Sequence, residues 1–193
     1  MVSIKIIVGS NRPGRFGIQP ANWLHEVAKQ YADKANIEIV DLAEINLPFL
    51  DETTPPSMSQ DYEKEYTKAW AKIISDSDGF VFVTPEYNHS YSAVLKNAID
   101  YLNPEWLHKP VSFLSYGGTA GGARSVEHLR GVVSQLGMYD LTEHMLLPEY
   151  YMNLDDQGQY KFSERHEKNA KLMLEALIFW AEKMKDARAD LAA

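Results

Sequence analysis

The middle of the chain contains the stretch Phe80-Val81-Phe82-Val83-Thr84-Pro85-Glu86-Tyr87-Asn88-His89-Ser90-Tyr91-Ser92. Its first five residues are aromatic or β-branched and are followed by a proline, which predicts a strand that is buried on both faces. Ser92 can cap a following helix, whose inner face would contain Val94, Leu95, Ala98, Ile99 and Leu102. A buried strand, a polar turn and a helix in this order are typical of a parallel α/β sheet.

Strands and helices alternate in the same way on both sides of this stretch. Apolar runs predict strands over residues 4–8, 37–42, 80–84 and 111–116 and one more within 139–147. Right-handed crossovers through the intervening helices give a doubly wound sandwich, in which a five-stranded parallel sheet has helices on both faces. Residues 1–193 are expected to form this α/β fold as a single domain.

Apolar spacing also predicts which side of each helix is buried. The first helix is expected over residues 17–34, and residues 43–60 are expected to be a loop because they carry prolines and little periodicity. The helix after residue 61 is expected to bury the stripe Tyr62, Tyr66, Ala69, Trp70 and Ile73. A turn at residues 155–158 precedes the last helix, which is expected to bury Met173, Leu177, Trp180 and Met184.

The composition excludes several classes of protein. The 193 residues include 27 acidic and 19 basic side chains, for a net charge of −8, and no cysteine. The missing thiols exclude a disulfide framework, a thiolate zinc site and a cysteine nucleophile. The negative charge argues against binding to nucleic acid or to an anionic membrane. No apolar run approaches the roughly 18 residues of a membrane span, and no signal peptide is recognisable, so a cytoplasmic protein is expected.

The site is expected at one edge of the sheet. In doubly wound sheets, ligands bind at the carboxyl ends of the strands, near the point where the strand order reverses. The segments that follow the first, third and fourth strands, residues 9–18, 84–92 and 115–122, are therefore the candidates. The six histidines show no metal-binding spacing, so no metal site is expected, and only His89 lies in one of these segments.

The first of these segments has the properties of a phosphate-binding loop. It contains glycines, a hydroxyl, Arg12 and Arg15, and it leads into the start of a helix, whose free N–H groups attract anions. A P-loop is excluded because Arg15-Phe16 stands where Lys-Ser/Thr is required, and no Gly-x-Gly-x-x-Gly follows the strand. A terminal monophosphate fits this segment, although a glycine-rich turn with two solvated arginines fits the local sequence as well.

The other two segments suit a planar ligand. Residues 84–92 bring backbone polar groups and flat aromatic surface together, as a heteroaromatic ring system requires, although an ordinary turn with capping hydroxyls is the alternative. Ser115-Tyr116-Gly117-Gly118 can place bare backbone against the edge of the same ligand, or can be a plain strand-to-helix turn.

Taken together, the three segments resemble the NAD(P)H-dependent FMN reductase family. The likeness rests on Gly-Ser-x-Arg-x-x-Arg after the first strand, Pro-Glu-Tyr-Asn-x-Ser after the third and Ser-Tyr-Gly-Gly-x-x-Gly-Gly after the fourth, and it runs over residues 2–147. That family has a flavodoxin-like fold and includes flavin, quinone and azo-dye reductases.

The resemblance implies a bound FMN, and its motifs assign residues to each part of that cofactor. The phosphate would be held by Ser10, Arg12 and Arg15 with backbone at Phe16 and Gly17. The isoalloxazine would be lined by Pro85, Glu86, Tyr87, Asn88 and Ser90. Its pyrimidine end would meet Tyr116, Gly117 and Gly118, next to Ser115. Ser92, Tyr101 and Arg15 stand where many members have proline, tryptophan and serine, and the last departure affects the phosphate geometry.

The implied activity is hydride transfer from NADPH or NADH to FMN and onward to a small-molecule acceptor such as free flavin, a quinone or an azo compound. No side chain is expected to be an obligatory acid, base or nucleophile, because the flavin carries the chemistry. Glu86 is expected to face water or a backbone amide. A flavodoxin-type electron carrier and a flavin-free scaffold are the alternatives, and the two arginines of the first segment favour the reductase.

A homodimer or a dimer of dimers is also expected. Tyr91, Tyr101 and Trp106 exceed the aromatic residues that one helix face needs, and aromatic residues are enriched at interfaces. The related reductases pair through this region. Trp70, Trp106 and Trp180 lie among apolar neighbours and are expected to be packing or interface residues.

Overall fold

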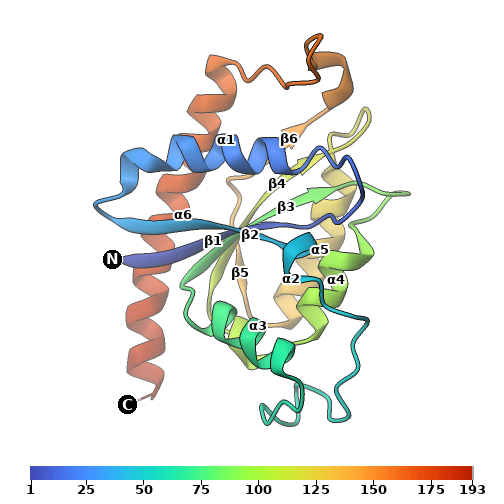
Figure 1. Ribbon diagram of the computed structural model, residues 1–193. Helices are drawn as coiled ribbons and strands as arrows, with labels where there is room; N and C mark the ends of the chain where they lie inside the picture. Colours follow the sequence, from blue (N-terminus) through green and yellow to red (C-terminus); the bar gives the residue numbers. More distant parts are fainter. Residues whose placement is uncertain (193) are drawn as a thin grey trace.

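The strands form one parallel sheet. The computed structural model describes residues 1–192, and its strands are β1 (Val2–Val8), β2 (Ala35–Asp41), β3 (Gly79–Pro85), β4 (Pro110–Tyr116), β5 (Tyr139–Asp140) and β6 (Met145–Leu147). The order is β2-β1-β3-β4-β5, with β6 also paired to β4, and each of these pairings is parallel (Figure 1). This is the flavodoxin-like order, so the predicted fold class is confirmed.

The fifth position of the sheet differs from the prediction of one continuous strand. Two short strands, β5 and β6, pair with opposite ends of β4, and residues 141–144 separate them. In this gap the Ser112 hydroxyl donates a hydrogen bond to the carbonyl of Glu143. A side chain of β4 therefore replaces the backbone ladder where the last strand is interrupted.

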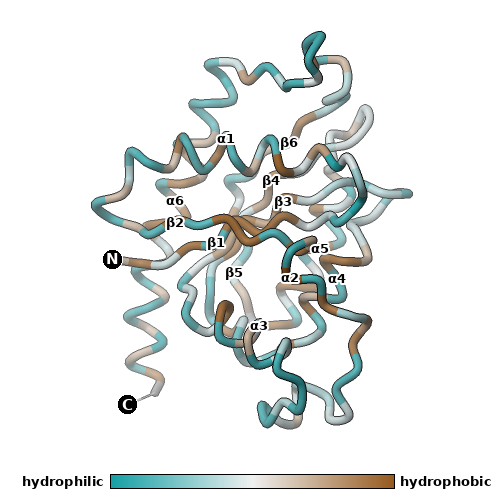
Figure 2. The backbone as a smooth tube through the Cα atoms, in the orientation of Figure 1, coloured by the Kyte–Doolittle hydropathy of each residue, from teal (hydrophilic) through white to brown (hydrophobic). Residues whose placement is uncertain are grey.

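Helices cover both faces of the sheet (Figure 1). One apolar core lies between the sheet and helices α1 (Ile18–Ala28) and α6 (Glu164–Ala192). The other lies between the sheet and helices α3 (Glu65–Ser75), α4 (Ala93–Asp100) and α5 (Ala123–Gln135). The strands are the most hydrophobic part of the chain, at the centre of the molecule (Figure 2). Ser92 caps α4 as predicted, because its side chain accepts a hydrogen bond from the N–H of Leu95.

Four short helices complete the architecture. They are α2 (Leu42–Ile45) and the 3-10 helices η1 (Lys29–Tyr31), η2 (Pro104–Trp106) and η3 (Tyr150–Asn153). Helix α2 lies where only a loop was predicted, and it forms because Asp41 caps its first turn by accepting a hydrogen bond from the N–H of Ala43 (2.9 Å). No helix within residues 1–192 has both the length and the apolar composition that a membrane crossing requires.

Two of the predicted apolar stripes were partly wrong. In α3, Ala69 is exposed, and the buried residues are Thr67, Trp70, Ala71 and Ile74. In α6, Met173 and Leu177 are buried, but Trp180 is 42% exposed. The buried face of α6 is centred on Leu174, Leu177 and Ala181, so Trp180 lies at its edge.

The aromatic residues around α4 belong to the core of a single chain. Trp106 is only 1% exposed, lies against the rings of Phe80 and Phe82, and donates a hydrogen bond to the carbonyl of Ile99 (3.2 Å). Tyr101 is fully buried. The prediction that Tyr101 and Trp106 are surplus to a helix face and available to an interface was therefore wrong.

A buried network at the amino edge of the sheet fixes the end of α6. Asp78 accepts hydrogen bonds from the N–H of Ser3 (3.0 Å), from Lys185 (2.9 Å) and from Arg188 (2.7 Å). Nearby, the Lys109 ammonium is buried and donates hydrogen bonds to the last carbonyls of α3. Burial, assisted by the charge of Arg188, lowers the pKa of Lys109 to about 8.

This shift predicts a pH dependence of stability. Between pH 8 and the ordinary Lys pKa of 10.5, the unfolded chain binds the Lys109 proton and the folded chain does not, so the free energy of unfolding rises with pH. From pH 8 to 9.5 we expect the native protein to gain about 1–2 kcal/mol relative to Lys109→Met, measured by urea unfolding. If the unfolding free energies of the native protein and Lys109→Met changed in parallel with pH, the lowered pKa of Lys109 would be contradicted.

Candidate functional site

The three predicted segments meet at the carboxyl edge of the sheet. The Ser92 hydroxyl donates a hydrogen bond to the carbonyl of Gly9, and the hydroxyls of Ser10 and Tyr87 lie 3.0 Å apart, so the segment after β1 contacts the segment after β3. The N–H of Glu86 donates to the carbonyl of Tyr116 (2.9 Å), which joins the segments after β3 and β4. The predicted convergence of these segments is confirmed.

The loop between β1 and α1 is rich in hydrogen-bond donors that have no acceptor. The amide groups of Ser10, Asn11, Phe16 and Gly17 find no backbone acceptor among residues 1–192. The first turn of α1 also has no side-chain cap. A helix N-terminus with free N–H groups carries a partial positive charge, which makes this loop a candidate anion site.

The two arginines of this loop have different environments. Arg12 is exposed and forms no ion pair within residues 1–192, and a hydrogen bond to the Tyr87 phenol raises its pKa. Arg15 instead pairs with the largely buried Asp41 at the carboxyl end of β2. Arg12 is therefore the free cation of the loop, whereas Arg15 ties the loop to β2.

The segment after β3 forms a tight, strained turn. Tyr87 and Ser90 exchange two backbone hydrogen bonds (2.8 and 3.1 Å), and Asn88 and His89 between them have φ angles of 49° and 77°. Two successive positive φ angles make a hairpin turn of type I′, which glycine and asparagine favour, so His89 is strained. The turn projects Tyr87 and Asn88 to the surface next to the donor-rich loop.

Glu86 has a structural role in this turn. Its carboxylate accepts a hydrogen bond from the N–H of Arg124 (3.2 Å) and pairs with the Arg124 guanidinium (2.7 Å), in the first turn of α5. This is the backbone-amide contact expected for Glu86 from the sequence. The Glu86 carboxylate therefore ties the turn after β3 to the start of α5.

The segment after β4 presents backbone at the same edge. Gly118 is exposed, and no atom lies within 4 Å of the position that a Cβ would occupy there, so a flat ligand can approach its backbone. The Ser115 hydroxyl is buried and donates to the carbonyl of Gly121 (3.0 Å), which fixes the start of the turn. Pro85 is also buried, and its carbonyl accepts a hydrogen bond from Ser125 (2.8 Å).

Sequence reasoning missed several residues around the site. The ring of Tyr150 stacks on Phe16 at a centroid distance of 4.2 Å. The side chain of Gln19 donates to the carbonyl of Gly158 (2.8 Å) and accepts from the N–H of Tyr160 (2.9 Å). Both contacts join the donor-rich loop and α1 to the segment that follows β6, more than 130 residues away. Nothing local in the sequence indicates such long-range pairs.

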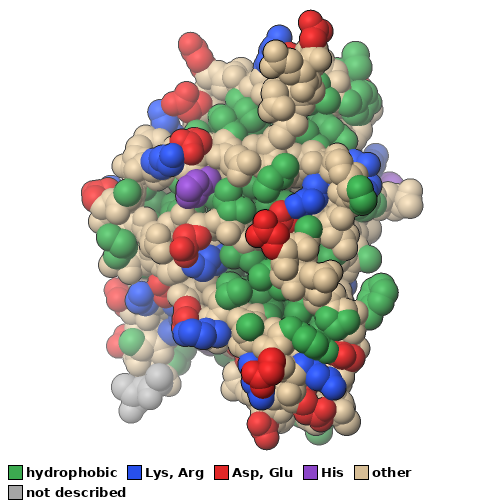
Figure 3. All heavy atoms as spheres, in the orientation of Figure 1, with side chains coloured by type: hydrophobic (Ala, Val, Ile, Leu, Met, Phe, Trp, Pro, Cys, Tyr) green, Lys and Arg blue, Asp and Glu red, His purple; other side chains and the backbone are tan. Residues whose placement is uncertain are grey.

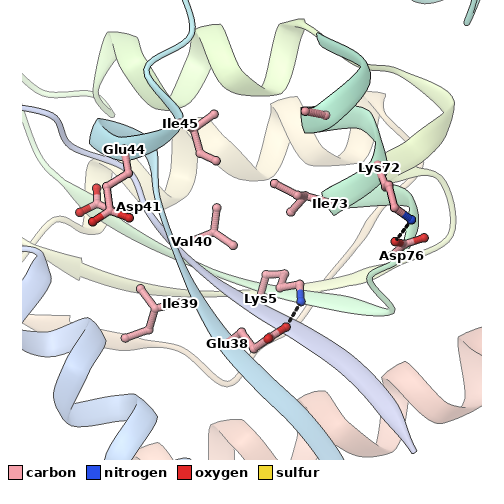
Figure 4. A pocket seen from close by; sticks show the side chains of 11 residues that line it. Lys5, Glu38, Ile39, Val40, Asp41, Glu44, Ile45, Lys72, Ile73 and Asp76 are labelled. Carbon is pink, nitrogen blue, oxygen red and sulfur yellow. Dashed lines mark hydrogen bonds and ion pairs between the residues drawn. The ribbon is translucent and has the colours of Figure 1, made fainter. Parts of the chain in front are cut away.

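A groove of about 530 Å³ runs along the outer edge of β2 and beside α3, and it borders the site only at Asp41, the partner of Arg15 (Figure 4). It contains none of the predicted site residues, and the ion pairs Lys5–Glu38 and Lys72–Asp76 occupy its polar side. Acidic and basic side chains are interspersed over the surface shown in Figure 3. Within residues 1–192, no cluster of three or more His, Asp or Glu side chains has the arrangement of a metal site.

Comparison with known sequences gives the family. Residues 2–151 match the profile of the family described as NADPH-dependent FMN reductase. The chain belongs to this family. Within the FMN reductase family, the chain is 44% identical to the NAD(P)H-dependent FMN reductase of Schizosaccharomyces pombe over 131 residues, or 66% of this chain and 65% of the relative. It is 32% identical to the FMN-dependent NADPH-azoreductase of Staphylococcus haemolyticus over 176 residues, or 90% of this chain and 92% of the relative.

The chain spans 65% and 64% of the length of the relatives from Schizosaccharomyces pombe and a Nectria species. It is also similar in structure to FerB, a flavoenzyme NAD(P)H:(acceptor) oxidoreductase from Paracoccus denitrificans. The TM-score is 0.72 at 21% identity, over 95% of this chain and 99% of FerB. This likeness supports the flavodoxin-like fold of the chain.

Proposed function

We propose that the chain is an FMN-dependent NAD(P)H oxidoreductase, which passes hydride from NADPH or NADH to bound FMN and electrons on to a small-molecule acceptor. The observation that carries this proposal is the donor-rich loop after β1, placed directly beside the exposed, strained turn after β3. The first binds an anionic group and the second offers a flat surface, and FMN has both a phosphate and a planar ring system. The names of the relatives, which are FMN, quinone and azo reductases, support the same activity.

The residues at this edge fit FMN. Ser10, Arg12 and the amides of Phe16 and Gly17 would hold the phosphate, with Arg15 positioned by Asp41. The turn from Pro85 to Ser90 would line the isoalloxazine, and Gly117 with Gly118 would meet its pyrimidine end. FMN supplies the hydride chemistry when it is bound, and the protein contributes binding and orientation.

The acceptor class follows from the relatives rather than from a dedicated pocket. Free flavin, a quinone or an azo compound is proposed as the acceptor, in line with the quinone oxidoreductase of Solanum tuberosum and the azoreductases among the relatives. No nucleic acid and no membrane is proposed as a partner. A cytoplasmic location and a single-domain organisation over residues 1–193 are also kept as proposals.

A homodimer is proposed on a different basis from the core aromatic residues. Phe49 is 83% exposed, although its loop is fixed to α4 by hydrogen bonds from Asn97 to the carbonyl of Pro48 (2.7 Å) and from the N–H of Leu50 to Asn97 (3.0 Å). An ordered loop that presents a bare aromatic side chain suits an interface, alone or within a dimer of dimers. Sedimentation at micromolar concentration is expected to show a species larger than the 21.9 kDa monomer, and a monomer would contradict the proposal.

Oxidation of reduced nicotinamide tests the activity. In the absence of oxygen, the protein saturated with FMN is expected to oxidise about one equivalent of NADPH or NADH on its own, and to oxidise more only when a quinone, an azo dye or free flavin is present to be reduced. Tight FMN binding without oxidation of either nucleotide, for any of these acceptors, would leave the electron-carrier alternative. A protein that binds no flavin, even after incubation with excess FMN, would leave the scaffold alternative.

A further inference from the structure

The Tyr116 hydroxyl makes none of the contacts that join the three segments of the candidate site. Tyr116 ends β4 and is only 3% exposed, yet its hydroxyl oxygen is buried without a hydrogen-bond partner among residues 1–192. The ring is held edge-on by Phe16, at a centroid distance of 5.1 Å, and by Tyr150, at 5.4 Å. Packing therefore fixes the position of the Tyr116 ring.

This hydroxyl points at the donor-rich loop between β1 and α1 and not at Gly117 and Gly118, which follow Tyr116 in sequence. A Cβ placed on Gly17 would lie 2.7 Å from the Tyr116 oxygen, so the oxygen lies directly against the start of α1. Burial and the nearby Tyr87 phenol raise the pKa of Tyr116, whereas the Ser10 hydroxyl and the Gly17 backbone oppose this shift. The oxygen thus lies among Ser10, Gly17 and Tyr87, at the centre of the loop.

A second unpaired donor belongs to the loop between β1 and α1. Three buried side-chain atoms lack a hydrogen-bond partner within the described chain, namely the Tyr116 oxygen, Nε of Arg15 and Oγ1 of Thr67. The first two belong to this loop or contact it, and both can donate a hydrogen bond. Together with the amides that have no backbone acceptor, they form a set of donors that lacks only an acceptor. An anion supplies that acceptor.

We propose that the Tyr116 hydroxyl is a further ligand-binding group of the phosphate loop and donates a hydrogen bond to the phosphate of FMN. The inference rests on the proposed function, and it moves the side chain of Tyr116 from the pyrimidine end of the flavin to the opposite end. Tyr87 contacts this part of the loop, because its hydroxyl lies 3.0 Å from that of Ser10. Because Tyr87 is 38% exposed, it can turn aside without disturbing the core and so open a path for the phosphate.

Tyr116→Phe tests the inference, because it keeps the packed ring and removes only the hydroxyl. We expect the Kd for FMN to rise about tenfold, the loss of one hydrogen bond to a charged group, and the Kd for riboflavin to change less than about twofold. The Tm of the flavin-free full chain is expected to stay equal or rise, because an unpaired buried hydroxyl is removed. The increase in Tm that inorganic phosphate causes in the native chain is expected to shrink in the variant.

Tyr160→Phe is the matched control. Tyr160 belongs to the same aromatic cluster, at a centroid distance of 5.5 Å from Phe16, and its hydroxyl is not among the unpaired buried atoms. Tyr160→Phe is expected to leave the Kd for FMN and the Kd for riboflavin unchanged. An equal loss of affinity for both flavins in Tyr116→Phe would overturn the inference, and so would a lower Tm with an unchanged FMN-to-riboflavin ratio or a failure to fold. A native chain that binds the two flavins equally would instead defeat the proposed function itself.

Discussion

Arg12→Ala is expected to weaken FMN binding by roughly 10- to 150-fold, the loss of about 1.5–3 kcal/mol of charge-assisted hydrogen bonding to the phosphate. The structure supports a large effect because Arg12 is exposed, has no carboxylate partner within residues 1–192 and lies next to the free amides of its loop. Riboflavin lacks the phosphate, so its affinity is expected to change little and the gap between the two flavins is expected to narrow. Quenching of flavin fluorescence during titration measures both affinities.

The control for this variant is Lys34→Ala. Lys34 is exposed and immediately precedes β2, at the opposite edge of the sheet, so its removal changes the net charge equally without touching the loop. Nucleotide oxidation by Arg12→Ala is expected to fall with FMN occupancy and to recover in excess FMN. If Arg12→Ala and Lys34→Ala weakened FMN binding equally, Arg12 would act only through the overall electrostatic field of the protein.

Trp106→Ala is expected to lower the free energy of unfolding by about 3–5 kcal/mol. Trp106 is buried, packs edge-on against Phe80 and Trp70, and donates a hydrogen bond to the carbonyl of Ile99, so the change leaves a cavity and removes that hydrogen bond. Urea unfolding, followed by circular dichroism, measures the loss.

Trp180→Ala is the matched variant, because Trp180 is 42% exposed on α6. Trp180→Ala is expected to lower the free energy of unfolding by less than about 1 kcal/mol. If Trp106→Ala kept its stability and instead changed the sedimentation of the protein, the interface role first predicted for Trp106 would be right and its core role wrong.

Most of the fold followed from local patterns. The buried run from Phe80 to Thr84, the proline after it and the capping Ser92 predicted a strand, a turn and a helix, and the structure contains all three. Parallel strands place their carboxyl ends at one edge, so the meeting of the three site segments followed from the order of the elements alone. The interrupted last strand did not, because the Ser112 hydrogen bond to Glu143 depends on contacts across the sheet.

The candidate site could be located from the sequence but not completed. Motif spacing placed Arg12 and Arg15 in one loop and could not show that Asp41, 26 residues further on, engages one of them. The sequence motif groups Tyr116 with Gly117 and Gly118, but the Tyr116 hydroxyl lies against Gly17 at the start of α1. Residues alternate in direction along a strand, and the motif does not say which way this side chain points. Side-chain direction and pairing between distant segments are the two properties that the motifs do not contain.

The most direct test of the central claim is the difference in affinity between FMN and riboflavin for the native full chain. The loop after β1 offers free amides, the Arg12 guanidinium and the buried Tyr116 phenol to an anion. The phosphate of FMN is therefore expected to supply much of the binding energy. Titration followed by flavin fluorescence is therefore expected to give a Kd for FMN at least about tenfold lower than for riboflavin. Equal affinities for the two flavins would contradict the account.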